Sequence, residues 1–458
     1  MISIEEIFPF ESILVISSLA VFLLVGVILR AKIRFLQKFL IPSCLIGGII
    51  AMILRNSGLI VLPLETLEIT VYHLFNLSFI SVGLTPASKI RKDGSKKDRI
   101  AGPLGMGLMQ GVIFPLQAII GGLFTIFFIG IGLDLFPTFG FLTPLGFIEG
   151  PGQALSIGET WQQIAGFTNA TVVGLTFAAI GFFFAFFVGV PLVDWGIRKG
   201  YSDQTPKVLP TDFVKGIITK NQKKQNAGLE TTHPANVDVL SFHFALVGLS
   251  YIATYGLVSL LTSILPSDIA KMIWGFFFFF GLVVALLVRL LITKLDVDYL
   301  LDRDVQKRIT GWSVDFLIVA TITSIELAIV WHYLLPISII SFITGIVTLL
   351  VVFYLGKRMW KRYALERTAG IFGTVTGTVP SGLLLVRILD PEFKTPAAID
   401  LGLTSIFAAP FVLSGMLLVN APVLWGWSME QTLLVFAVML LVALALIRLF
   451  GLWGKPQF

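Results

Sequence analysis

Residues 149–161 read EGPGQALSIGETW, and they combine a carboxylate, a proline and three glycines inside a mainly apolar region. A loop at a membrane surface, or a kink in an ordinary transmembrane helix, would each explain this stretch by itself. The flanking sequence favours a third interpretation. The apolar arm before it, 136–148, has 13 residues and as a helix would be about 20 Å long. That is too short to cross hydrocarbon about 30 Å thick, but long enough to reach its middle and return.

The composition indicates that lipid is the solvent for most of the surface of this chain. Hydrophobic residues make up 56% of it and charged residues 13%, and the mean hydropathy is +0.92. We therefore predict an all-α polytopic membrane protein. The single Cys44 excludes an intrachain disulfide. One cysteine and four scattered histidines form no pattern of an enzyme site, so we expect no enzymatic activity.

Eleven windows are apolar enough for membrane-crossing helices, each of which needs roughly 20 residues. They are 11–30, 39–54, 67–85, 100–132, 168–195, 238–263, 270–293, 312–331, 335–355, 397–420 and 430–450. Glu5, Glu6 and Glu11 replace the basic start of a cleaved signal peptide, so we expect the first window to be retained.

Basic residues cluster after the first, third, fifth, seventh and ninth windows, whereas the opposite loops hold only Arg55 and Lys271. Because positively charged loops stay in the cytoplasm, this alternation predicts an N-terminus outside and a C-terminus in the cytoplasm. We expect a multi-pass protein of the cell membrane, the inner membrane in a bacterium. The alternation holds only if 133–167 and 368–396 each enter and leave the membrane on one side.

The second of these segments contains GIFGTVTGTVPSG at 370–382, which again groups glycines, hydroxyl side chains and a proline. The sequence thus predicts two re-entrant hairpins, one that opens outward and one that opens inward. Within its own half of the chain, each hairpin has four predicted crossings before it and one after it. Since five is an odd number, the second half of the chain is predicted to lie upside down relative to the first.

The predicted organisation is therefore two inverted-topology repeats of five transmembrane helices, each with a hairpin, and one additional C-terminal helix. The repeats occupy 1–195 and 238–420, a cytoplasmic linker occupies 196–237, and the additional helix lies within 421–458. Paired Gly/Pro-interrupted segments in inverted repeats are typical of secondary transporters, whose substrate and ion sites lie where the broken elements meet. The sequence does not indicate which helices move.

Hairpin tips leave backbone groups unpaired, and in lipid these need water, protein or a ligand. N–H groups at a helix start suit a carboxylate, whereas carbonyl and hydroxyl oxygens suit Na⁺. The candidate substrate-binding residues are Gly150, Gly152, Gln153, Ser156, Asn169, Gly373, Thr374, Thr376, Gly377 and Thr378. The candidate Na⁺ ligands are Glu149, Asn76, Ser78, Asp315 and Thr378.

Other interpretations stay open for several polar residues. Glu149 could instead cap the second hairpin helix or face outer water. Asp315 lies near the cytoplasmic end of its window, and Glu326 lies near the outer end, where solvation costs little. Gln110, Gln117 and Asn420 are expected to form hydrogen bonds between helices.

Several motifs resemble one family. GFTNAT at 166–171, after a glycine-rich hairpin that ends at Trp161, resembles the corresponding stretch of bacterial sodium/glutamate symporters. FISVGL at 79–84, Ile41-Pro42 leading to Gly47-Gly48, and AGIFGTVTGTVPSG at 369–382 are also similar to that family. The resemblance covers most of 11–420 and implies a five-plus-five inverted-repeat fold with two re-entrant loops that moves glutamate with Na⁺.

The chain departs from that pattern at the first tip, where Glu149-Gly150-Pro151-Gly152 stands in place of Gly-Gly-His-Gly. The predicted function is Na⁺-coupled symport of glutamate or a related amino acid or carboxylate by alternating access. The expected partners are that small anion and the bilayer, without nucleic acid, and the sequence leaves a homodimer open. The alternatives are a proton-coupled carrier of another organic solute and an ion channel that uses the hairpins as a filter.

Overall fold

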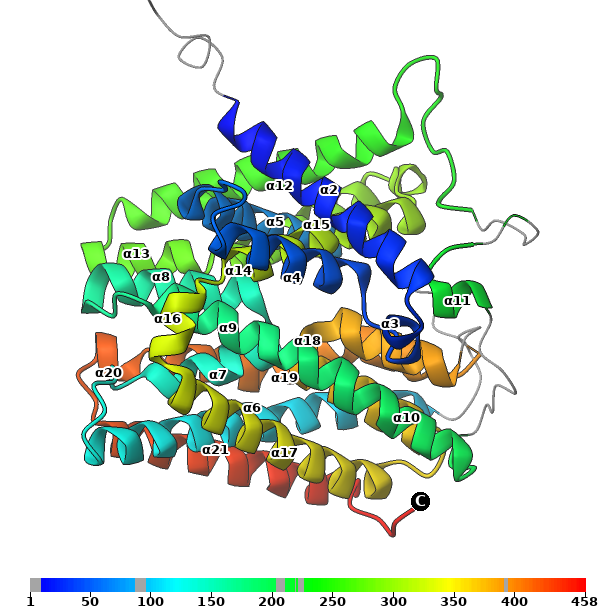
Figure 1. Ribbon diagram of the computed structural model, residues 1–458. Helices are drawn as coiled ribbons and strands as arrows, with labels where there is room; N and C mark the ends of the chain where they lie inside the picture. Colours follow the sequence, from blue (N-terminus) through cyan, green and yellow to red (C-terminus); the bar gives the residue numbers. More distant parts are fainter. Residues whose placement is uncertain (1–9, 87–95, 203–210, 219, 221–225, 391–393) are drawn as a thin grey trace, which may run out of the picture.

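The computed structural model of the protein describes residues 10–86, 96–202, 211–218, 220, 226–390 and 394–458 (Figure 1). All regular secondary structure within these residues is helical, as predicted. By length and composition, ten of the described helices could cross a membrane. The basic loop 87–95 lies outside the described residues.

The helices form two bundles, which Figure 1 shows as an upper and a lower layer. The upper layer, called the α5 bundle below, consists of α2 (Glu11–Lys32), α4 (Ser43–Asn56), α5 (Leu64–Leu84), α12 (Val239–Thr262), α13 (Ser267–Gly275), α14 (Phe277–Lys294) and α15 (Arg303–Ser324).

The lower layer, called the hairpin bundle, contains both Gly/Pro-rich segments. It consists of α6 (Lys96–Gly130), α7 (Leu142–Pro144), α8 (Pro151–Ala165), α9 (Ala170–Phe183), α10 (Gly189–Arg198), α17 (Leu334–Met359), α18 (Ala364–Leu389), α19 (Ala397–Leu418), α20 (Ala421–Leu424) and α21 (Met429–Leu449). Three short helices lie outside the two layers: α3 (Arg34–Lys38), α11 (Thr211–Lys215) and α16 (Leu327–His332). Each bundle therefore takes helices from both halves of the chain.

Small residues allow the helices of the α5 bundle to pack closely. A Cβ placed on Gly48 of α4 would lie 2.8 Å from Cβ of Ile322 on α15. In the same way, a Cβ on Gly83 of α5 would lie 2.7 Å from Cβ of Ala285 on α14. Glycine faces of this kind bring backbones together in lipid, where no hydrophobic force drives helices to associate.

The C-terminal helix α21 belongs to the hairpin bundle, where it covers α6. The rings of Phe114 on α6 and Phe436 on α21 lie 6.5 Å apart, and a Cβ on Gly122 would lie 2.7 Å from a methyl carbon of Leu433. The helix α6 also packs along α19, with Gly107 against Phe407.

Although α18 is long and apolar enough to cross a membrane, it folds back on itself. Its backbone leaves helical geometry at Gly377 and Thr378. A Cβ on Gly382 would lie 2.3 Å from the carbonyl oxygen of Gly370, whereas in a straight helix residues twelve positions apart would be separated by about 18 Å. The segment predicted as the second hairpin was 368–396. In the structure the two arms of α18, Ala364–Leu389, form this chain reversal.

The first hairpin is also present as a chain reversal, but its first arm differs from the prediction. In place of one helix over 136–148, the arm has a 3₁₀ turn at Phe139–Phe141, then α7, then a π-helical turn at Leu145–Glu149. The two ends of the hairpin meet, since the rings of Phe136 and Phe167 stack with centroids 4.8 Å apart. The glycines and prolines of this arm disfavour a regular helix, so neighbouring elements determine its path.

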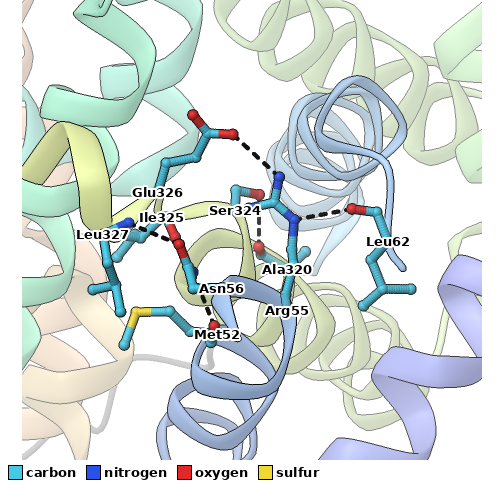
Figure 2. Close-up of polar contacts among 9 residues, drawn as sticks. All are labelled: Met52, Arg55, Asn56, Leu62, Ala320, Ser324, Ile325, Glu326 and Leu327. Atoms are coloured by element: carbon cyan, nitrogen blue, oxygen red, sulfur yellow. Dashed lines mark hydrogen bonds and ion pairs between the residues drawn. The ribbon is translucent and has the colours of Figure 1, made fainter. Parts of the chain in front are cut away.

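The expected crossing at 312–331 is wrong as a single helix. The chain leaves helical geometry at Ile325 and Glu326, between α15 and α16 (Figure 2). The side chain of Asn56 fills the break: its Nδ2 donates to the Ile325 carbonyl and its Oδ1 accepts from the Leu327 amide, both at 2.9 Å. Arg55 pairs with Glu326 at 3.3 Å. The break is stable because side chains from α4 replace the missing helical hydrogen bonds.

The window 39–54 also differs from the prediction. Its helix, α4, begins at Ser43 and has 14 residues, about 21 Å of helix. It is shorter than the ten candidate crossing helices.

Candidate functional site

The two hairpin tips meet inside the molecule. A Cβ on Gly150, at the first tip, would lie 2.5 Å from the methyl carbon of Thr378, at the second tip. Gly150 has φ 90° and ψ −175°, and Thr378 has φ 68° and ψ 170°. Two chain breaks from opposite halves of the sequence thus share one position in the fold.

The backbone at Thr378 is strained. Its φ and ψ fall in a region that is essentially reserved for glycine, and a β-branched residue there costs of order 1–3 kcal/mol. Such strain persists only where surrounding structure fixes it, and it concentrates at functional sites.

The tips lie where the hairpin bundle touches the α5 bundle. A Cβ on Gly152, in the first turn of α8, would lie 1.9 Å from the ring of Phe75 on α5. From the other side, a Cβ on Gly181 of α9 would lie 2.3 Å from the carbonyl oxygen of Thr376. Both glycines are required because neighbouring atoms occupy the space that a side chain would need.

Several polar side chains at this place are buried and have no hydrogen-bond partner within the described part of the chain. They are Oε1 of Glu149, both amide atoms of Gln153 and Oγ of Ser156. Gln153 is 0% exposed. A buried polar group without a partner costs about 1–3 kcal/mol, so these groups are available to a ligand. Asn76 of α5, a predicted Na⁺ ligand, lies instead beside the hydroxyl groups of Tyr72 and Tyr251.

The alternatives for Glu149 can be compared with its position. Oε1 of Glu149 is buried, so this atom does not face outer water. Gly150 stands at the N-cap position of α8 and has no side chain with which to cap it, and Pro151 follows as the first helical residue. Gln110 of α6, expected to link helices, lies beside the Glu149 carboxylate.

The predicted residues of the second hairpin surround the same tip. The hydroxyl groups of Thr374 and Thr376 donate to the carbonyls of Gly370 and Phe372, at 2.9 and 2.8 Å. Their oxygen lone pairs stay available for a cation. Gly373 packs against Gly382 of the other arm, and Gly377 is part of the break itself.

Three predicted residues take other positions. Asn169 begins α9, near Oη of Tyr333 at 3.5 Å, and α9 places it about 18 Å from Gly181 beside the tips. Asp315 lies on α15 beside the Cys44 thiol, within the α5 bundle. Ser78 donates its hydroxyl proton to the Phe75 carbonyl on the same helix.

The predicted hydrogen bonds between helices are confirmed for two residues. Gln117 of α6 donates to Oγ1 of Thr348 on α17 and to the Val375 carbonyl of α18, both at 3.1 Å. Asn420 accepts from the Trp161 indole at 2.7 Å.

Two features of the structure were not predicted from the sequence: the buried ion pair between Arg367 and Asp400, and the contact of the Phe75 ring with Gly152. Arg367 donates to Asp400 at 2.7–2.8 Å, and the two side chains are 9% and 6% exposed. Arg367 looks like a member of the basic loop before it, and only its place next to a glycine-rich segment could have indicated burial. Phe75 carries no signal beyond its neighbour Asn76.

Within the described residues, no three His, Cys, Asp or Glu side chains gather where they could hold a metal ion. A cation at the tips would therefore have neutral oxygens among its ligands, with Glu149 as the nearby carboxylate. Neutral oxygens from broken helices are typical of Na⁺ sites in transporters.

An all-helical membrane protein in which two broken elements meet at unpaired polar groups has the architecture of a transporter. The sequence profile of the sodium/glutamate symporter family matches residues 8–394. The chain belongs to this family and is a multi-pass membrane transporter, in agreement with the expectation of no enzymatic activity. The search of curated proteins finds no match. The additional helix α21 lies beyond the matched residues.

Proposed function

We propose that this protein is a symporter that couples Na⁺ entry to uptake of glutamate or a related amino acid or carboxylate. Family membership supports both the cation and the class of substrate. The single observation that carries the proposal is the meeting of Gly150 and Thr378 beside buried, unpartnered polar groups. A permanent structure gains no stability from such groups, whereas a binding site needs them.

The predicted inverted repeats are part of the proposal. Two parallel helix pairs support them: α4 packs along α15, and α5 packs along α14. If each half of the chain is replaced by the other, the pair α4–α15 becomes the pair α14–α5. In this arrangement each half contributes three main helices to the α5 bundle and a helix, hairpin and helix to the hairpin bundle.

This division also gives a role to each bundle. The hairpin bundle carries the substrate past the α5 bundle, because both tips belong to the hairpin bundle and Phe75 reaches the first tip from the other side. The hairpins are re-entrant, the first from outside and the second from the cytoplasm, and the N-terminus is outside. Lysine and arginine positions support that orientation.

At the tips, Gln153 and Ser156 bind polar groups of the substrate, and Gly150 and Gly152 let the ligand approach the backbone. Glu149 and the hydroxyl of Thr378 help to bind the coupling cation. An ionised Glu149 would repel an anionic substrate. A cation between the carboxylate and the substrate therefore makes substrate binding and cation binding depend on each other.

The test is uptake of radiolabelled glutamate into liposomes that contain the purified protein, with an inward gradient of Na⁺ or of choline. We expect saturable uptake that requires Na⁺, and counterflow of unlabelled substrate, which an ion channel would not support. Glutamate, aspartate and citrate as competitors would define the substrate. Uptake that is equal in Na⁺ and choline would contradict Na⁺ coupling.

Proton coupling is the second candidate, because the buried Glu149 carboxylate could bind a proton in place of Na⁺. Glu149→Gln keeps size and hydrogen bonding but removes the charge. For a Na⁺ ligand we expect the Na⁺ concentration that gives half-maximal uptake to rise about tenfold or more, the equivalent of one lost charged interaction. Glu159→Gln on the same hairpin, where Gln162 and Gln163 contact the carboxylate, is the control and should leave it unchanged.

If uptake is driven by a pH gradient in the wild type and loses that dependence in Glu149→Gln, the proton-coupled alternative holds. Unchanged Na⁺ and proton dependence in this variant would exclude Glu149 as the coupling residue.

A further inference from the structure

Three unpartnered oxygens lie in the hairpin bundle away from the tips. They are Oε1 of Gln117 on α6, Oγ1 of Thr143 on α7 and Oγ1 of Thr344 on α17. All three residues are 0% exposed. None of them belongs to the site at Gly150 and Thr378.

The state of the two threonines is unusual for this protein. Most buried helical threonines donate the hydroxyl proton to the carbonyl four residues earlier, which is the ordinary way to bury that group. Thr125, Thr176, Thr323, Thr368, Thr376 and Thr404 all do so. Thr143 and Thr344 form no such bond within the described residues, and therefore their oxygens are free for another partner.

The orientation of the Gln117 carboxamide is fixed by its neighbours. The Val375 carbonyl can only accept a hydrogen bond, so the amide nitrogen of Gln117 must be the atom that faces it. Thr348 takes the second hydrogen of the same nitrogen. Oε1 consequently points elsewhere and is left as a buried acceptor with no donor among the described residues.

The packing of α6 places these oxygens near one another. Gly121 and Gly140 touch, since a Cβ on Gly121 would lie 2.1 Å from the Gly140 carbonyl oxygen. Gln117 lies one turn before Gly121 on α6, and Thr143 lies one turn after Gly140 on the first hairpin. Since the Glu149 end of that hairpin reaches Gln110 of α6, the two segments run antiparallel and bring Gln117 to the level of Thr143.

The same register applies to α17. Its Thr348 contacts Gln117, and its Trp360 lies against Gly105 of α6, so α17 also runs antiparallel to α6. Thr344 lies one turn before Thr348 and therefore at the level of Gly121. Three helical segments thus each contribute one buried oxygen within about one helical turn of the level of Gln117 on α6.

The chemistry of these oxygens selects the class of ligand. Hydroxyl and amide oxygens are neutral and suit a monovalent cation, whereas Ca²⁺ and Mg²⁺ are typically bound with carboxylates. The π-helical turn Leu145–Glu149 follows directly after α7, and the irregular backbone of such a turn can supply further carbonyl oxygens.

We propose that Gln117, Thr143 and Thr344 form a Na⁺ site separate from Glu149. This inference rests on the proposed Na⁺ coupling and assigns ligands to it. The site also connects to the tips, because the Gln117 carboxamide that would bind the ion holds the Val375 carbonyl, three residues before Thr378. Na⁺ bound here orders Gln117, which fixes the second hairpin in the geometry that receives the substrate.

The experiment compares Thr143→Val and Thr344→Val with the wild type. The melting temperature of the purified protein is measured against NaCl concentration, with choline chloride to keep ionic strength constant. We expect the half-maximal Na⁺ concentration to rise about tenfold or more in each variant, because one ligand of about 1.4 kcal/mol is lost. Thr323→Val, which removes a buried hydroxyl bonded to its own helix, should keep the wild-type value.

Thr143→Ser and Thr344→Ser restore an oxygen and separate loss of the ligand from a change in packing. They should recover most of the Na⁺ response if the hydroxyls bind the ion. If both valine variants keep the wild-type Na⁺ response, the oxygens bind only water and the inference fails, although Na⁺-coupled uptake by the wild type still stands. If wild-type uptake needs no Na⁺, the proposed function fails, and the melting curves still report whether the ion binds.

Discussion

The two hairpins reach one point in the fold but are stabilised in different ways. The first breaks at Gly150, and both of its arms pack on α9, through Gly146 against Ala178 and Gly158 against Ala170. The second breaks at Thr378, and its arms pack on each other.

Their anchors differ as well. A neutral hydrogen bond between Trp161 and Asn420 secures the first hairpin. A buried ion pair between Arg367 and Asp400 secures the second. The strained tip belongs to the hairpin that has the charged anchor and the closer internal packing. A break at glycine costs little strain and therefore requires less support.

The largest effect is expected from the two anchors. Asp400→Ala leaves the buried charge of Arg367 without its carboxylate partner, which should destabilise the protein by about 3–5 kcal/mol. Asn420→Ala removes a neutral partner and should cost about 1–3 kcal/mol. Thermal unfolding in detergent measures both. The contrast between the anchors fails if the Asn420 variant is the less stable of the two.

The packing within the second hairpin should give the next largest effect. Gly382→Ala places a methyl group 2.3 Å from the Gly370 carbonyl, and the arms must separate at a cost of about 1–3 kcal/mol. Gly402→Ala on α19, where nothing lies within 4 Å, is the matched control and should gain up to about 1 kcal/mol from helix propensity. An equal melting temperature for both variants would show that the arms do not need the close contact.

The smallest effect concerns the tips themselves. Thr378→Gly relieves the strained backbone and should stabilise the protein by about 1 kcal/mol, whereas Gly150→Ala introduces strain and a contact with Thr378 and should destabilise it. If the strain serves substrate binding, the more stable Thr378→Gly variant will have a higher KM for uptake. A Thr378→Gly variant that is less stable than the wild type would mean that the threonine side chain, and not its backbone, determines the stability of this tip.

The existence of both hairpins could be predicted because the signal is local. The glycines and prolines of 149–161 and 370–382 divide apolar segments into arms that are each too short to cross a bilayer. The same reasoning identified Gly150, Gly152, Gly377 and Thr378, which meet in the structure. Asn169 was assigned to the site because of its motif alone. A sequence motif does not show how far a residue lies from the hairpin tip.

The break between α15 and α16 could not be predicted from its own sequence. Residues 312–331 are mainly apolar. The side chain that replaces the missing helical hydrogen bonds at the break is that of Asn56, which is far away in the sequence. Arg367 and Asp400 present the same difficulty, because they lie far apart in the sequence and neither indicates the other as its partner.

The sequence by itself indicated that this chain is helical, that it is a membrane protein and that its two Gly/Pro-rich segments reverse direction. Those properties follow from hydrocarbon length and local backbone preference, which depend only on neighbouring residues. The tertiary structure decided which helices share a bundle, that the tips touch, and which buried polar groups lack partners. These features depend on contacts between residues far apart in the chain, and close packing at glycines such as Gly152 and Gly382 fixes them only after the helices have assembled.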